Sequence, residues 1–311
     1  MKKLVFFNVL LIAVSALMFS AGLVLPGFII AGVCLSVLVA CGGFIPAAIS
    51  SAVALLICSG VSAGSIVEFL LGGIVPGIAI GLGYIKRLRL PQAMIAPSLS
   101  FCGMWAYMFV FYKKTTGNNM FEDATSLIVE SFKQSLTALP AENALPENFT
   151  KELISVFETG MDVFQLIVPS LVILFSCILS FAVIMISKKL VFRHGGPIVS
   201  FSKLYVPSSA IAVTFICGIL FFTIKTPFKF FLGNVLILML CFYFLCGFST
   251  VDFFFRRKLP RTAIRILIYI LGFMFLGLII PQFVYTFIFM VGALDSMFDF
   301  RKLRPRKKDK E

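Results

Sequence analysis

The sequence predicts an all-α integral membrane protein with nine or ten transmembrane helices and an extracytoplasmic amphipathic helical hairpin. The first reason is composition: of 311 residues, 60% are hydrophobic and 13% charged, and the mean hydropathy is +1.05. A soluble domain carries about 25% charged residues, so this chain lacks a polar surface. The second reason is that one long hydrophilic, mostly acidic segment, from Lys113 to Asp162, interrupts otherwise apolar runs.

The positive charges indicate how the chain is oriented. The net charge is +13, and the cations stand in short clusters between apolar runs: Lys2-Lys3, Lys86 to Arg89, Lys188 to Arg193, Arg256 to Arg261, and Arg301 to Lys310. Lys and Arg of membrane proteins stay on the cytoplasmic side. We therefore expect a multi-pass protein of the cell membrane with both termini in the cytoplasm and the lipid bilayer as its surroundings. The clustering argues against nucleic acid as a partner.

Five apolar runs precede the acidic segment. They cover residues 4–25, 28–41, 44–61, 66–85 and 92–112. The first could be a signal peptide cleaved near Ala21, but its length and the spans that follow favour an uncleaved helix. Pro26-Gly27 is expected to turn the chain. The second run is shorter than the roughly 20 residues that a crossing helix needs, so it crosses tilted, is re-entrant, or joins the next run.

The acidic segment has the periodicity of two amphipathic helices. Apolar residues recur three, four or seven positions apart from Phe121 to Leu139 and again from Phe149 to Met161, and residues 140–146 separate the two stretches. One face of each helix would be apolar and the other charged. The pair could be a lid, or it could lie on the bilayer surface.

Five further runs complete the chain. They cover residues 164–187, 206–224, 229–254, 262–280 and 282–296. With ten crossings every basic cluster falls on the cytoplasmic side and the hairpin falls outside. With nine crossings that agreement needs 28–41 to be re-entrant. The predicted organisation is a first transmembrane half at 1–112, the hairpin at 113–163, a second transmembrane half at 164–300, and a basic tail at 301–311.

Polar residues inside apolar spans are the candidate binding residues. An ionisable group in hydrocarbon is costly and usually faces a cavity or a partner. Glu68 is the leading candidate for contact with a small solute, and Asn234 and Trp105 are the other two. The alternative for Glu68 is that its side chain extends to the membrane interface, and for Asn234 a hydrogen bond between helices.

Glycines line one face of the fourth span. Gly73, Gly77 and Gly81 recur every four residues, and Pro76 lies among them. Small residues at this spacing let a second helix approach closely. We expect a helix-packing face with a kink at Pro76, and the alternative is a kink that faces a ligand.

Catalytic and metal sites are not indicated. All eight cysteines lie in apolar runs without a CxxC pair, and the single histidine, His194, lies in a basic loop. No nucleophile motif is present. Asp252 is expected to pair with Arg256, and Asp295 and Asp299 with the cations that follow them. We expect no enzyme activity, no catalytic residues, no cofactor and no metal.

The end of the chain resembles a known family. Residues 292–302 read Gly-Ala-Leu-Asp-Ser-Met-Phe-Asp-Phe-Arg-Lys. This stretch is similar to the closing motif of the YybS-like family of uncharacterised bacterial multi-pass membrane proteins. Residues 189–193, Val206-Pro207, Asn234 and Gly247-Phe248 agree in position, and the likeness covers most of the chain.

The resemblance implies two functions. The first half of the family is similar to the S components of energy-coupling-factor transporters, which bind a small solute and dock on a coupling subunit through small residues of the first span, here Ala16 and Ser20. It is more distantly similar to the rod-shape protein MreD. The leading hypothesis is therefore transport, with a small solute held between helices of the first half and the hairpin as a lid. The alternative is a cell-envelope scaffold that binds other membrane proteins through the glycine face and the basic loops.

Overall fold

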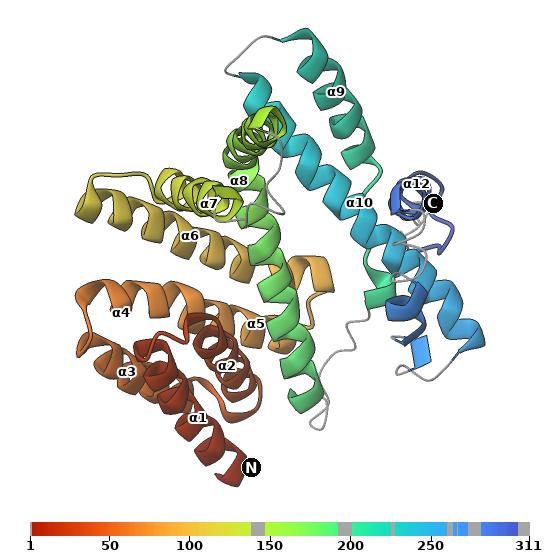
Figure 1. The fold of residues 1–311 in the computed structure, drawn as a ribbon. Coiled ribbons are helices and arrows are strands. Elements are labelled where there is room, and N and C mark those ends of the chain that lie inside the picture. The colour runs from red at the N-terminus through yellow and green to blue at the C-terminus, as the bar shows by residue number, and fades with distance from the viewer. Residues whose placement is uncertain are drawn as a thin grey trace. The chain divides into compact units, whose positions relative to one another are not determined.

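The computed structural model describes residues 2–137, 147–191, 201–224, 228–259, 264–265, 267–272 and 281–303 (Figure 1). In these ranges every regular element is a helix, which confirms the all-α fold class. The chain forms two compact units. Unit 1 comprises Met1–Leu88 and Gln92–Pro197, and unit 2 comprises Arg89–Pro91 and Ile198–Glu311.

Unit 1 begins with α1 (Lys2–Ser20), α2 (Val24–Val37) and α3 (Phe44–Ser59). The chain turns at Gly22, whose φ of +87° suits glycine, and not at Pro26-Gly27 as the sequence suggested. Pro26 lies instead in the first turn of α2, where a missing N–H leaves no helical hydrogen bond broken.

A π-helical turn at Leu38–Gly42 continues α2. Together they make a helical span of 19 residues, Val24–Gly42. At 1.5 Å per residue this is about 28 Å, close to the ~30 Å of bilayer hydrocarbon. The apolar run counted from the sequence covered only residues 28–41 and so was too short to cross. The helix is longer because it starts before Pro26.

The fourth expected span is built from two helices. α4 (Ala63–Phe69) passes through a second π-helical turn, Leu70–Ile74, into α5 (Val75–Ile85). Pro76 lies in the first turn of α5, directly after this wide turn. The π-helical turn thus absorbs the backbone change that proline requires. α6 (Leu90–Thr116) follows.

The hydrophilic segment forms α7 (Met120–Thr137) and the beginning of α8 (Glu147–Val191). α8 is one continuous helix of 45 residues. The boundary expected between residues 163 and 164 therefore falls inside a helix. At about 68 Å, α8 is roughly twice as long as bilayer hydrocarbon is thick. One crossing therefore needs only about half of the helix, and the apolar second half, unlike the amphipathic first half, is suited to hydrocarbon.

α7 packs on both of its neighbours (Figure 1). The contacts with α8 are a stacked ring pair, Phe132 and Phe157 with centroids 4.1 Å apart; an ion pair, Lys133 to Glu158 at 2.7 Å; and a hydrogen bond, Gln165 to Thr125 at 2.6 Å. Tyr112 of α6 donates a hydrogen bond of 2.8 Å to Asp123. Contacts along α7 thus hold it against α6 and α8 within unit 1.

α2 is the central helix of unit 1, in contact with α1, α5 and α8. The rings of Phe19, Phe28 and Phe69 lie mutually 5.3 to 6.3 Å apart at its first turns and are buried. α1, α2 and α4 each contribute one of these rings, and the burial of the rings holds the three helices together.

Unit 2 is organised around α10 (Phe228–Lys258). A short turn at Phe201–Lys203, α9 (Ser209–Thr223) and α12 (Pro281–Phe298) pack against it. α10 and α12 cross at Gly247 and Gly292. A Cβ atom at either glycine would collide with the backbone of the other helix, at Ile288 or Tyr243, so neither position accepts a side chain.

Five helical spans in the described ranges are long and apolar enough to cross a membrane: Val24–Gly42, Ala63–Ile85, Leu90–Thr116, Asn148–Val191 and Phe228–Arg256. Four shorter apolar helices coincide with further expected spans: Phe6–Ser20, Phe44–Ser59, Ser209–Thr223 and Phe283–Phe298. The expected span 262–280 lies largely outside the described residues.

Candidate functional site

Glu68 lies in the second turn of α4, inside the membrane-span candidate Ala63–Ile85. Ser62 begins this helix, since its hydroxyl accepts a hydrogen bond of 3.0 Å from the N–H of Ser65. The Glu68 side chain is half-buried and, within the described ranges, has no hydrogen bond or ion pair. A carboxylate in an apolar span without a partner is unusual, because its charge is not compensated there.

A residue before Glu68 in α4 and a residue after it in the π-helical turn both contact α6. A Cβ atom added at Gly64 would lie 3.4 Å from both the Tyr107 hydroxyl and the Phe111 ring. At Gly72 it would lie 2.6 Å from the sulfur of Met104. Gly72 lies in the π-helical turn, where its missing Cβ would also be 2.7 Å from the Phe28 ring of α2. Glu68 stands one turn after Gly64, the α4 residue next to α6.

The π-helical turn after α4 exposes a backbone carbonyl. A π-helical turn inserts a residue into the helix, so one carbonyl loses its usual donor. Ser100 of α6 donates a hydrogen bond of 2.6 Å to the carbonyl of Leu71, inside this turn. The serine thus compensates for the irregular backbone next to Glu68.

The glycine face of α5 lies against α2. A Cβ atom at Gly73 would be 3.1 Å from the Cβ of Ala31; at Gly77 it would be 2.7 Å from the Cβ of Leu35. At Gly81 it would be 2.6 Å from the Cβ of Val39. Both helices contribute residues spaced by four, and the missing side chains bring the two backbones together. α2 therefore covers this face.

Trp105 lies on another side of α6. Its ring is 6.3 Å from that of Phe109 and 6.0 Å from that of Phe175 in α8, and its indole N–H is buried without an acceptor in the described part of the chain. Asn234 belongs to unit 2, where its amide donates to the carbonyl of Phe230 at 2.9 Å. The ring contacts of Trp105 thus lie within α6 and with α8, and the hydrogen bond of Asn234 to Phe230 lies within α10.

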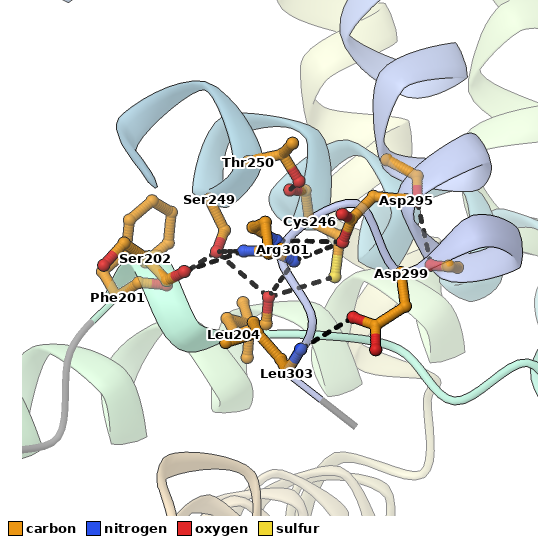
Figure 2. Close-up of polar contacts among 12 residues, drawn as sticks. Phe201, Ser202, Leu204, Cys246, Ser249, Thr250, Asp295, Asp299, Arg301 and Leu303 are labelled. Carbon is orange, nitrogen blue, oxygen red and sulfur yellow. Dashed lines mark hydrogen bonds and ion pairs between the residues drawn. The ribbon is translucent and has the colours of Figure 1, made fainter. Parts of the chain in front are cut away.

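Unit 2 contains a buried ionic cluster that sequence reasoning missed (Figure 2). Arg301, whose side chain is 0% exposed, has five N–H groups, and each donates a hydrogen bond. The Nε and one Nη2 hydrogen reach Asp295 Oδ2 at 2.9 and 2.7 Å. The other acceptors are the carbonyls of Ser202 and Leu204 and the hydroxyl of Ser249, at 2.6 to 2.9 Å.

The sequence had suggested only that Asp295 and Asp299 pair with nearby cations. Asp295 does pair with Arg301, while Asp299 accepts from the backbone N–H of Leu303 at 2.8 Å. Nothing in the sequence indicated that Arg301 would also reach residues about a hundred positions earlier. Arg301, placed in the basic tail by the predicted boundary at 301, is instead part of the unit's interior.

A second buried carboxylate lies on α10. Asp252 of α10 accepts from Arg256 at 2.9 Å, which confirms the expected pair. It also accepts from Arg265 at 3.2 Å and from the hydroxyl of Tyr269 at 3.1 Å. Arg265 is buried and donates to the carbonyl of Leu259 at 2.6 Å. Both ionic clusters of unit 2 are thus internally hydrogen-bonded, as buried charges must be.

The described ranges contain no group of three His, Cys, Asp or Glu side chains that could hold a metal ion. All eight cysteines are free.

A protein-family comparison identifies the chain. The family described as "Predicted membrane protein (DUF2232)" matches residues 7–296, nearly the whole sequence. The chain belongs to the DUF2232 family. Membership and several apolar helices together establish this DUF2232 protein as a multi-helix membrane protein. Neither a curated protein nor a solved structure matches it.

Proposed function

We propose that this DUF2232 protein is a transport-type membrane protein that captures a small solute between helices of unit 1. The observation that carries the proposal is the half-buried carboxylate of Glu68 within the span Ala63–Ile85, which has no hydrogen bond or ion pair among the residues that the structure describes. A charge kept inside an apolar span without an internal partner is most simply explained by an external one. The adjacent π-helical turn supports the same interpretation, because such turns occur frequently at functional sites.

In this proposal the protein crosses the cell membrane nine or ten times, both termini are cytoplasmic, and the hairpin of α7 and the beginning of α8 lies outside as a lid. The basic clusters between the apolar helices support that orientation. The protein is not an enzyme in this view, and the YybS-like resemblance with its S-component-like first half supports solute capture without chemistry.

Two surfaces that were expected to bind other proteins are buried within unit 1. Ala16, one of the small residues expected to dock on a coupling subunit, is 0% exposed inside unit 1. The glycine face proposed for a scaffold is covered by α2. A coupling subunit or a protein of the envelope machinery would have to bind through other surfaces, so the buried Ala16 weakens the S-component likeness and the covered glycine face weakens the scaffold alternative. Capture of a solute at Glu68 depends on neither surface.

Native mass spectrometry of the protein purified in mild detergent tests the proposal. We expect the wild type to retain a small solute and Glu68→Gln to lose it. Glu152→Gln is the matched control, since Glu152 is an exposed carboxylate on the first half of α8. Equal spectra for wild type and Glu68→Gln, with no bound mass in either, would contradict solute capture at Glu68.

A further inference from the structure

One end of unit 1 collects positive charge from two helices. Tyr84, near the end of α5, donates a hydrogen bond of 2.7 Å to the carbonyl of Ile184 in α8, and its hydroxyl lies 2.9 Å from that of Ser187. Both helices continue into cations within three residues of these contacts: Lys86, Arg87, Lys188 and Lys189. The buried tyrosine thus brings two basic pairs, about a hundred positions apart in the sequence, to the same end of unit 1.

These four cations have no carboxylate beside them in the described part of unit 1. The helices α1, α2, α3, α5 and α6 contain no Asp or Glu. Glu68 lies 17 residues before the end of α5 at Ile85, or roughly 25 Å of helix. Asp162 lies 26 residues before Lys188 along α8, or roughly 40 Å, and α7 packs on that distant part of α8. The basic end of unit 1 therefore keeps a net positive charge.

The cations lie where two apolar spans end. The span candidates Ala63–Ile85 and Asn148–Val191 both reach this end of unit 1. A helix that crosses a bilayer has its ends near the lipid headgroups, where Lys and Arg are commonly found. Apolar side chains next to the cations are exposed: Ile85 is 51% exposed, Ile186 45% and Leu190 43%. Cations beside exposed apolar side chains fit an amphiphile with an anionic headgroup.

Arg87 occupies a backbone position that favours glycine. Its φ is +52°. Its N–H donates to the carbonyl of Tyr84 at 3.2 Å, and the N–H of Leu88 donates to the carbonyl of Gly83 at 2.9 Å. Many helices end with these two hydrogen bonds, usually with glycine in the left-handed position, as α1 does with Gly22 at φ +87°. Because an arginine strains the backbone there, its charged side chain is a candidate for a function that glycine could not supply.

We propose that the basic end of unit 1 binds the headgroup of an anionic phospholipid. The side chains of Lys86, Arg87 and Lys189 are exposed and form no hydrogen bond or ion pair with another described residue, so their N–H groups can donate to phosphate oxygens. Arginine suits this role because its planar guanidinium donates two parallel hydrogen bonds to a phosphate. Basic pockets between transmembrane helices bind such headgroups in other membrane proteins. The inference does not depend on capture of a solute at Glu68.

Two phospholipids with equal acyl chains test the headgroup. Phosphatidylglycerol is anionic, whereas phosphatidylcholine is zwitterionic. Each is added at the same concentration to the purified full-length protein in a mild uncharged detergent, and native mass spectrometry counts the lipid molecules that the protein retains. We expect the wild type to retain at least one molecule more of phosphatidylglycerol than of phosphatidylcholine, because only the former has a net charge opposite to that of the cations.

Two multiple variants locate the retained lipid. Lys86→Gln/Arg87→Gln/Lys189→Gln should retain at least one phosphatidylglycerol fewer than the wild type. Its affinity for that lipid should fall about a hundredfold, since each cation near a membrane surface contributes about a factor of five. Lys113→Gln/Lys114→Gln is the matched control, because these exposed lysines stand at the far end of α6, and it should retain as many as the wild type.

Arg87→Gly separates binding of the lipid from stability of the fold. Glycine accepts a φ of +52° without strain, so without added lipid this variant should have a Tm equal to or above that of the wild type. The rise in Tm on addition of phosphatidylglycerol should be smaller in Arg87→Gly, because its affinity for the headgroup is about fivefold weaker. Inorganic phosphate at the same concentration should not raise the Tm of either protein, because it lacks acyl chains.

Several outcomes would overturn the lipid site. These are equal retention of the two lipids by the wild type, equal retention of phosphatidylglycerol by the triple variant and the wild type, and an equal loss in the Lys113→Gln/Lys114→Gln control. A rise in Tm from inorganic phosphate as large as that from phosphatidylglycerol would show that the cations bind free phosphate instead. An equal lipid-induced rise in Arg87→Gly and the wild type would overturn the role of Arg87.

Discussion

Arg301 directs two of its N–H groups at a single oxygen of Asp295, and the other oxygen of that carboxylate is buried without a hydrogen-bond donor in the described ranges. The remaining guanidinium hydrogens fasten α10 and the loop at residues 202–204 to the end of α12. The ion pair is thus the point where three segments of unit 2 meet.

Replacement of Arg301 should destabilise unit 2. Arg301→Met removes the donor from the Asp295 carboxylate and one donor from each of two loop carbonyls, and loss of one partner of a buried pair costs about 3–5 kcal/mol. Thermal unfolding in detergent, followed by circular dichroism, measures the loss as a lower Tm. Arg301→Lys should also lower the Tm, because an ammonium cannot replace five donors in a planar arrangement.

Lys302→Met is the control for Arg301, because Lys302 follows it directly and is exposed. It should leave the Tm unchanged. Equal Tm values for Arg301→Met and Lys302→Met would contradict the structural importance of the buried pair.

The contact between α2 and α5 should not accept a methyl group. Gly77→Ala would place a Cβ atom 2.7 Å from that of Leu35 and 3.0 Å from the carbonyl of Gly32, both on α2. Overpacking of this kind costs about 1–3 kcal/mol. The measurement is again the Tm in detergent.

Gly103→Ala is the matched control, since Gly103 lies in α6 with no atom within 4 Å of its missing Cβ. It should be neutral or stabilising by about 0.5–1 kcal/mol, because alanine favours the helix over glycine. A Gly77→Ala variant as stable as Gly103→Ala would show that the two helices are further apart than described.

The hydrogen bond from Ser100 to Leu71 should stabilise the π-helical turn next to Glu68. Ser100→Ala removes the donor from a carbonyl in an apolar environment, and we expect a loss of about 0.6 kcal/mol, the average for hydrogen bonds between membrane helices, and at most about 1.7 kcal/mol. Ser59→Ala should cost less, because the exposed Ser59 hydroxyl bonds only within its own helix. Indistinguishable Tm values would mean that the turn needs no side-chain donor.

The stacked rings of Phe132 and Phe157 should stabilise the hairpin more than the ion pair of Lys133 and Glu158 does. The side chains of Lys133 and Glu158 are 45% and 47% exposed, so their pair contributes about 0–1 kcal/mol and weakens with salt. Phe132→Ala removes a stacked contact worth about 0.5–1.5 kcal/mol beyond its buried area. Limited proteolysis of the segment between α7 and α8 should therefore accelerate more in Phe132→Ala than in Lys133→Gln. Faster proteolysis of Lys133→Gln than of Phe132→Ala would show that the ion pair contributes more than the rings.

Some residues of the candidate sites could be predicted from the sequence, and others could not. Glu68 could be selected because a carboxylate in an apolar run needs no structure to be noticed. The contact of Tyr107 and Phe111 with Gly64 could not be predicted, because only the fold brings α6 residues some forty positions away to α4. Asp252 and Arg256 are four apart on one helix, so their pair was predictable, whereas Arg265 and Tyr269 reach Asp252 from the next segment.

By itself the sequence determined that this chain is a helical membrane protein, because hydrocarbon requires long apolar runs whose backbone hydrogen bonds close within each helix, and such runs are visible residue by residue. Only the tertiary structure decided that α8 is continuous, that α2 covers the glycines of α5, and that Arg301 lies inside unit 2. These features depend on distances between segments remote in sequence, which hydropathy and spacing along the chain do not contain.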